Sequence, residues 1–313
     1  MNVRRYLSAG LAVTALVALT ACGGSSSSGG ASGDTPCSQL VFGGPPEFQK
    51  RADGLPGLSE TYGCDFKDFR ALDAGGPLTV KALEDGTIGA ADLFTTDPTI
   101  TAKGFVVLED PRNNFAAQNV VPLINKAKAT PDATAALNAV SAKLTTAGLI
   151  ALNGTLAASD KPDVGPVAKA WLTENQLLTD PAPAGSAGPV AIGSANFPES
   201  RVLAEIYAQV LELKGFAVTR KFGIGSRELY FPSLRDGSID LVPDYTGVLL
   251  QYIDKKAEQT GADDVYNALR TAVPEPLTVL ERSAAEDKDA VVVTAATAQK
   301  YGRSLEGYGT PRG

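Results

Sequence analysis

Short apolar runs alternate with segments of helical periodicity over most of the chain. Residues 190–194 form a short apolar run, which predicts a buried strand. Apolar side chains then recur every three to four positions over 201–214, which predicts a helix beginning near Pro198 and ending at Gly215. The alternation continues over three segments: 217–222 (strand), 226–234 (helix) and 239–243 (strand). This β-α-β-α-β unit predicts parallel strands joined by right-handed crossovers.

A similar alternation occupies the N-terminal half. Strands are predicted over 40–42, 88–94, 105–108 and 119–124, with helices after Pro45, over 79–83 and after the Asp97-Pro98 cap. Residues 132–178 have a helical pattern with Trp171 on its apolar face, and 181–188 is a Pro/Gly/Ala linker. The whole pattern predicts an α/β fold.

The N-terminus has the features of an export signal. Arg4 and Arg5 precede an apolar stretch over 7–21, which is too short for a membrane span. It ends in Leu-Thr-Ala-Cys22, followed by a Gly/Ser run. We therefore predict a signal peptide over 1–21, a lipid on Cys22 and a flexible tether over 22–36. An ordinary signal peptide with a chance cysteine is the alternative.

Composition excludes several kinds of chemistry. The 313 residues include no histidine, so the sequence holds no Ser-His-Asp or Cys-His catalytic group and no imidazole metal ligand. A formal net charge of −7 argues against binding to nucleic acid. In an exported chain, Cys37 and Cys64 predict a disulfide with a Cα separation within about 7 Å. Two free thiols are the alternative.

Two blocks of sequence motifs resemble a known family. One block contains Ile192-Gly-Ser-Ala-Asn-Phe-Pro-Glu-Ser, Ile224-Gly-Ser-Arg-Glu and Asp240-Leu-Val-Pro-Asp-Tyr-Thr-Gly. The other contains Gly43-Gly-Pro-Pro-Glu-Phe, Asp92-Leu-Phe-Thr-Thr-Asp, Val107-Leu-Glu-Asp-Pro and Asn119-Val-Val-Pro-Leu. Both resemble the substrate-binding proteins of ABC importers for quaternary amines such as glycine betaine, choline and carnitine. The resemblance implies a two-lobe periplasmic-binding-protein type II fold with two hinge strands.

The order of the two blocks is the reverse of the family's, which we interpret as a circular permutation. The linker 181–188 would then join the family's usual termini. Lobe II would combine 37–93 with 291–313, and lobe I would span 94–290, with hinge strands near 94–96 and 290–294. A fusion of two half-proteins is the alternative, but each block occurs once.

The resemblance also implies a ligand cage. Tyr245 occupies the family's cage tyrosine position and Phe94 its second aromatic position, while Gln118 and Asp289 replace tyrosines. Asp287 lies two residues before Asp289, on the same face of an extended segment. We expect a pocket that is less aromatic and more acidic than the family's. The alternatives are a packing role for Tyr245 and a solvated charge run for the two aspartates.

Four further residues are ligand-binding candidates. Arg51 would bind an anionic end of the ligand from lobe II, although a surface salt bridge with Asp53 is the alternative. Phe197 and Ser200 lie in the first turn of a predicted helix, where an anion can bind. Thr96 lies at the predicted hinge.

One position weakens the match to a betaine carboxylate, because Ala195 stands where the family often has lysine. Arg227 is interpreted as a structural cap or a contact between the lobes. Choline or an unrelated solute therefore remains open.

The sequence thus predicts a binding protein rather than an enzyme, with no cofactor and no metal. We expect a monomer, lipid-anchored on the outer face of the cell membrane, that passes a small cationic or zwitterionic solute to an ABC permease. The alternatives are the same role for a non-quaternary solute, a carboxylate-dependent exported enzyme or a sensory binding module.

Overall fold

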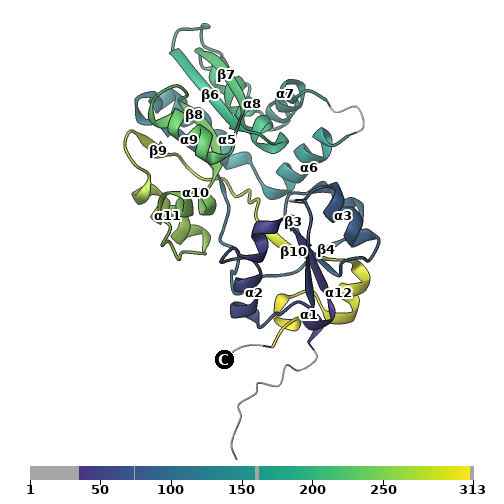
Figure 1. Cartoon of the computed structure of the whole chain (residues 1–313). Coiled ribbons are helices and arrows are strands. Elements are labelled where there is room, and N and C mark those ends of the chain that lie inside the picture. Colours follow the sequence, from purple (N-terminus) through teal and green to yellow (C-terminus); the bar gives the residue numbers. More distant parts are fainter. Residues whose placement is uncertain (1–34, 74, 159–161, 311–313) are drawn as a thin grey trace, which may run out of the picture. The chain divides into compact units, whose positions relative to one another are not determined.

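The computed structural model describes residues 35–310 except 74 and 159–161 (Figure 1). The predicted signal peptide, the lipidated Cys22 and nearly all of the tether lie outside the described residues. The described chain forms two five-stranded sheets with the orders β2-β1-β3-β10-β4 and β7-β6-β8-β5-β9. In each sheet, three neighbouring strands are parallel and the fourth runs antiparallel to both of its neighbours. The α/β, two-sheet prediction is confirmed.

The first sheet is built from the two ends of the described chain. Its strands are β1 (Val41–Gly44), β2 (Asp68–Ala71), β3 (Ala90–Phe94), β4 (Val106–Val107) and β10 (Asp289–Val293). Its helices are α1 (Pro36–Gln39), α2 (Leu55–Tyr62), α3 (Pro77–Glu84), α4 (Pro98–Ala102) and α12 (Ala295–Tyr301), with 3-10 turns at Pro46–Gln49 and Leu305–Gly307. Alternate residues of β10 enter opposite cores, one with α1, α2 and α12 and one with α3 and α4. This period of two makes β10 a fully buried strand.

The second sheet uses the middle of the chain. Its strands are β5 (Val120–Asn125), β6 (Gly188–Ala195), β7 (Phe216–Gly225), β8 (Leu241–Tyr245) and β9 (Leu277–Val279). Its helices are α5 (Pro131–Lys143), α6 (Thr146–Leu156), α7 (Val164–Glu174), α8 (Pro198–Leu213), α9 (Arg227–Arg235), α10 (Thr246–Ile253) and α11 (Ala262–Ala272), with a 3-10 turn at Lys126–Lys128. Helices α5 to α8 contribute to the core on one face, and α9 to α11 to the core on the other. No single described helix is long and apolar enough to cross a membrane, and α5 and α6 qualify only as a pair bent by 89°.

The predicted β-α-β-α-β unit corresponds to β6, α8, β7, α9 and β8. Strand β6 pairs in parallel with both β7 and β8, as expected. Helix α8 begins with Pro198 at its first position, and Gly215 follows its end with a positive φ of 85°. Glycine adopts that backbone conformation at little cost, which explains why the helix ends where the sequence predicted.

The chain crosses between the sheets later than the sequence analysis expected. Strand β4 pairs with β10, and Ile100 of α4 packs in a core of the first sheet. The segment after Phe94 therefore stays with the first sheet, and the chain crosses between Val107 and Val120. It returns between Val279 and Asp289. The expected boundaries at 94 and 290 are corrected accordingly, because the apolar run near Val107 pairs with β10 rather than with the second sheet.

The two ends of the described chain meet at the first sheet. The Cys37 amide donates to the Tyr308 carbonyl over 3.0 Å. A disulfide joins Cys37 to Cys64, with 5.4 Å between the Cα atoms. Both sulfur positions are fully buried in the same core as Tyr308. Helix α1, β1 and the C-terminal segment are thereby held together.

Candidate functional site

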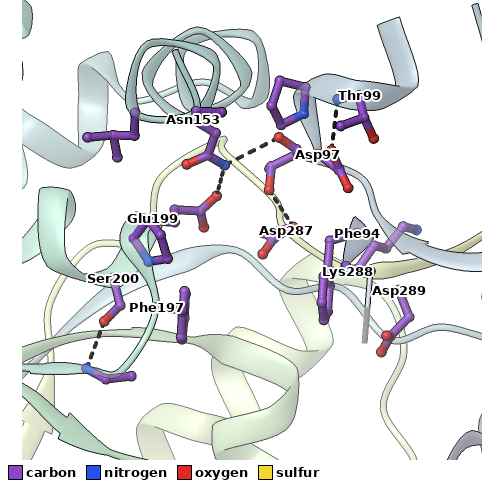
Figure 2. A pocket seen from close by; sticks show the side chains of 18 of the residues that line it. Phe94, Asp97, Thr99, Asn153, Phe197, Glu199, Ser200, Asp287, Lys288 and Asp289 are labelled. Atoms are coloured by element: carbon purple, nitrogen blue, oxygen red, sulfur yellow. Dashed lines mark hydrogen bonds between the residues drawn. The ribbon is translucent and has the colours of Figure 1, made fainter. Parts of the chain in front are cut away.

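A cavity of about 880 Å³ collects most of the residues that the sequence singled out (Figure 2). Eight of the nine ligand-binding candidates line it: Phe94, Thr96, Gln118, Phe197, Ser200, Tyr245, Asp287 and Asp289. Arg51 is not among the lining residues. Residues from both sheets therefore contribute to one cavity.

Strand direction explains why these side chains meet. Phe94, Ala195 and Tyr245 are the last residues of the parallel strands β3, β6 and β8. Gln118 and Asp289 stand at the beginning of the antiparallel strands β5 and β10. Antiparallel strands begin where their parallel neighbours end, so all five positions reach one edge of their sheets. Ligand sites of open α/β sheets lie at this edge.

Four aromatic residues line the cavity, namely Phe94, Phe197, Tyr230 and Tyr245. Phe94 and Phe197 are 38% and 39% exposed, which is unusual for large apolar side chains that have a core nearby. The Phe197 ring stacks on Tyr245, with the centroids 6.2 Å apart and the planes at 30°. A Cβ at Gly75 would come within 3.1 Å of the Phe94 ring, so glycine there makes room for it. Tyr245 is largely buried, which fits both the cage role and the packing role that the sequence left open.

Glu199 is a buried carboxylate that the sequence analysis missed. It occupies the second position of α8, is 4% exposed and accepts a short hydrogen bond from the Tyr245 hydroxyl. Asn153 of α6 donates to its other oxygen over 2.6 Å. The place of Glu199 in the sequence, between the candidates Phe197 and Ser200, could have identified it as a site residue. An acid in a first helical turn is ordinarily explained by the helix dipole, which hid its role here.

Asp287 supplies a second carboxylate, on the segment that returns to the first sheet. Thr96 donates its hydroxyl hydrogen to Asp287 Oδ1 over 2.7 Å. Burial raises the pKa of Asp287 well above that of a free aspartate, and the charge of Glu199 raises this pKa further. The hydrogen bond from Thr96 acts in the opposite direction. The acidic character predicted for 287 and 289 therefore belongs to the cavity wall and not to a solvated loop.

Arg51 is engaged by acids of its own sheet instead of lining the cavity. Its Nε lies 2.6 Å from Asp53 Oδ1 and its Nη2 lies 2.6 Å from Asp289 Oδ2. The salt bridge with Asp53 was the alternative considered from the sequence. Behind this pair, burial raises the pKa of Asp92 well above its usual value, and the charge of Asp289 adds to that shift. In the described structure Arg51 neutralises acids and does not offer its charge to the cavity.

Ser200 and Gln118 line the cavity while bonding to the backbone. Ser200 Oγ accepts the Ala195 amide over 2.9 Å. Gln118 Oε1 accepts the Val248 amide, also over 2.9 Å. The Ser200 hydroxyl thus links the start of α8 to the end of β6. The Gln118 side chain uses only its amide oxygen in this way, and its amide nitrogen has no such bond among the described residues.

The remaining cations of the lining are mostly paired. Arg227, interpreted from the sequence as a structural contact, binds the buried Asp244 through Nε and Nη2 at 3.2 and 2.6 Å. Lys103 binds Glu84 over 2.8 Å at the outer part of the lining. Among the described residues, no three Cys, Asp or Glu side chains are placed to hold a metal ion together.

Two sheets of this topology, with one shared cavity at their strand ends, define a solute-binding protein of the periplasmic-binding-protein type II class. Sequence comparison specifies the family. The chain matches the family described as "Substrate binding domain of ABC-type glycine betaine transport system" over residues 26–174 and 188–304. The chain belongs to this family.

A curated relative and several solved structures are similar to the chain. The glycine-betaine-binding protein of Pseudomonas aeruginosa is 31% identical over 149 residues, which is 46% of this chain and 47% of that protein. The chain thus spans about half the length of the curated relative that it matches.

Structural likenesses are weaker. The tungstate-binding protein TupA of Desulfovibrio alaskensis G20 has a TM-score of 0.38 at 11% identity, covering 85% of this chain and 86% of that one. YCKB_BACSU of Bacillus subtilis has a TM-score of 0.42 at 12% identity, covering 85% and 83%.

Proposed function

We propose that this chain is an extracytoplasmic receptor that captures a small solute with a quaternary-ammonium head, of the glycine betaine or choline type, and delivers it to an ABC permease. One observation carries the proposal: the rings of Phe94, Phe197 and Tyr245 line the same cavity as the carboxylates of Glu199 and Asp287. The mechanism is binding and release, with no bond broken.

The chemistry of a methylated ammonium matches this lining. The head has no hydrogen to donate and no lone pair, so aromatic faces, apolar contact and the field of carboxylates must hold it. Each aromatic face contributes about 0.5–2 kcal/mol, depending on how far the site is desolvated. Glu199 already accepts two hydrogen bonds and so contributes its charge rather than a new hydrogen bond.

Cavity size favours one alternative, a larger or non-quaternary cation. A volume of about 880 Å³ lies near the upper end of the range for ligand pockets, roughly 300–1,000 Å³. Gln118 and Asp289 also replace aromatic cage positions of the resembled family. The receptor role is the same in this alternative, and only the solute differs.

The cellular setting of the proposal follows from the family and from the N-terminal residues. The Leu-Thr-Ala-Cys22 motif supports a lipid anchor that holds a monomeric receptor at the outer face of the membrane. Membership of an importer family supports a permease as partner. A role without bond-breaking chemistry makes the protein a receptor and not an enzyme.

Circular permutation is also part of the proposal. The family match falls in two segments on either side of residues 175–187. The adjacency of Cys37 and Tyr308 is what a permutant requires, because these positions would be continuous in an unpermuted chain.

The test is calorimetric titration of residues 35–313 with glycine betaine, choline, carnitine and the sugar trehalose. We expect a quaternary amine to bind and trehalose to be silent. Phe197→Ala should weaken the binding about 3–30-fold, the equivalent of one aromatic face. Leu229→Ala is the matched control, because Leu229 is also exposed (58%) but does not line the cavity. A folded protein that binds no quaternary amine would overturn the proposal.

A further inference from the structure

Gln118 is a buried polar side chain in the wall of the cavity. It lies where the chain crosses from the first sheet to the second, two residues before β5 begins. The residue is 8% exposed, and its side chain lines the cavity. A buried amide without its hydrogen-bond partners is costly, so the use of each end of this group matters.

One end of the Gln118 amide is fixed by α10. Its carbonyl oxygen accepts the Val248 amide, which is one of the unpaired N–H groups in the first turn of that helix. A Cβ at Gly247 would lie only 2.8 Å from Gln118 Nε2, so glycine leaves the space that this amide occupies. The capping bond therefore determines which end is oxygen and which is nitrogen.

The other end has donors to spare. Gln118 Nε2 has no hydrogen-bond partner among the described residues, and it is not among the described polar atoms sealed from solvent. An amide nitrogen carries two N–H donors. A buried donor at a cavity wall is satisfied by whatever occupies the cavity.

Asp287 lies directly beside Gln118. The Asp287 backbone amide donates to the Gln118 carbonyl over 3.2 Å, so the two side chains leave adjacent points of the wall. Thr96 bonds the Asp287 carboxylate through its hydroxyl, on Oδ1, and through its backbone amide. The wall thus presents a negative group and a neutral donor next to each other.

We propose that Gln118 is a specificity-determining residue, whose amide donates to an oxygen that the ligand carries a short distance from its cationic head. The inference deepens the proposed function and rests on it. A hydroxyl or carboxylate two or three bonds from the charged nitrogen satisfies both wall groups at once. A bare cation satisfies Asp287 and leaves the Gln118 donors unpaired.

The test compares ligands that share a cationic head and differ in the group that carries this oxygen. Tetramethylammonium carries none, choline carries a hydroxyl and glycine betaine a carboxylate. Ethylamine, ethanolamine and β-alanine form the parallel series with a primary ammonium head. Calorimetry gives the affinity of each oxygen-bearing ligand relative to the bare cation of its series. In the natural chain we expect choline and glycine betaine to bind about tenfold or more tighter than tetramethylammonium.

The deciding variant is Gln118→Glu. It keeps an oxygen for the Val248 amide, so the cap of α10 and the melting temperature should persist, but it replaces the donor by a second acceptor. Tetramethylammonium reports the added charge. Against that reference, glycine betaine should lose at least tenfold, while choline, whose hydroxyl can donate to the new carboxylate, should lose less.

The outcomes separate the two claims. An unchanged ratio of glycine betaine to tetramethylammonium in Gln118→Glu would overturn the role of Gln118 and leave the proposed function standing. Binding confined to the primary amines, with the ratio changing as described in that series, would support Gln118 and overturn the quaternary head. If the folded protein bound neither series, both claims would fail.

Discussion

Asp287 combines the two properties that a cation site needs, a negative charge and a low-dielectric setting. Burial and the neighbouring Glu199 both raise its pKa, so its carboxyl binds a proton more tightly than a free aspartate does. The groups that face it are Thr96, Glu199 and Asp289, with Tyr245 close enough to feel its charge. A bound cation stabilises the ionised form of Asp287 and so lowers its pKa, whereas the neighbouring acids raise this pKa.

Cation affinity should therefore rise with pH. Because the pKa of Asp287 in the free protein lies well above that of an ordinary aspartate, the rise covers the pH interval below this raised pKa and levels off once Asp287 is ionised. Binding in that interval releases a proton, which calorimetry in two buffers of different ionisation enthalpy measures directly. The unliganded protein behaves oppositely: its folded state holds a proton that the unfolded chain has lost, so this group's contribution to stability falls as pH rises.

Asp287→Asn is the control for this prediction. The variant should bind cations more weakly and lose most of the proton release. If the release persisted in full, the titrating group would have to be another acid, with Asp92 the first candidate, since burial also raises the pKa of Asp92.

Single residues differed in how far their place could be read from the sequence. Tyr245, Phe94 and Asp289 were found through the resemblance, because they occupy the cage positions of the resembled family. Glu199 was missed because nothing in a helical first turn distinguishes a dipole partner from a buried hydrogen-bond acceptor. Arg51 was placed in the cavity because its pairing with Asp289 is a long-range contact, although the local pairing with Asp53 was foreseen. Pairing across 238 positions leaves no local pattern.

Among the elements, those with a strong period were predictable and the short edge elements were not. Strands β6 and β8 and helix α8 have clear apolar patterns and clear stop signals. Strand β2 reads Asp-Phe-Arg-Ala and is mostly exposed, and four residues with one large apolar side chain give only a weak strand pattern. Strand β2 forms because β1 has a free edge with which it pairs, and the four residues of β2 do not by themselves indicate this pairing.

The start of α10 gives a prediction at this scale. A Cβ at Gly247 would lie 2.7 Å from the Ala117 carbonyl oxygen and 2.8 Å from Gln118 Nε2. We expect Gly247→Ala to lower the free energy of unfolding by about 1–3 kcal/mol, because backbone on one side cannot yield. Urea denaturation measures the change.

A glycine in another helix is the matched control. Gly154 lies in α6, and a Cβ there would meet only Pro98 at 3.7 Å, an ordinary contact. Gly154→Ala should leave stability unchanged or raise it by about 0.5–1 kcal/mol. Equal losses at both positions would show that crowding at Gly247 is not the cause.

Two passages of the chain connect the two sheets. One passage brings Gln118 to the cavity and the other brings Asp287, and the backbone bond between these residues joins the passages. Periodicity predicted the α/β class, and the resemblance to the family predicted the two-lobe fold. The crossing points were not predictable, because the short β4 has the same apolar appearance as a strand of either sheet.

Reversing the proposed permutation tests the whole-molecule interpretation. A chain opened at Gly185, with residue 310 joined to residue 35 by a short Gly/Ser linker, should fold and bind the same ligand with unchanged affinity. The adjacency of Cys37 and Tyr308 makes that join short. Circular dichroism and calorimetry decide the matter, and a chain that failed to fold would argue for two halves that depend on their present order.

The disulfide and the backbone hydrogen bond of Cys37, at the start of the described chain, have a mechanical consequence. A pulling force applied at residue 35 meets α1 first and then the disulfide at Cys37. The covalent bond passes the load to Cys64, behind α2, before β1 can be peeled from its neighbours. The Cys37 amide also holds Tyr308, near the other end of the described chain. A receptor pulled at its N-terminus should therefore unfold only when a whole core is disrupted, and not by the detachment of one strand. Reducing the disulfide should lower the unfolding force.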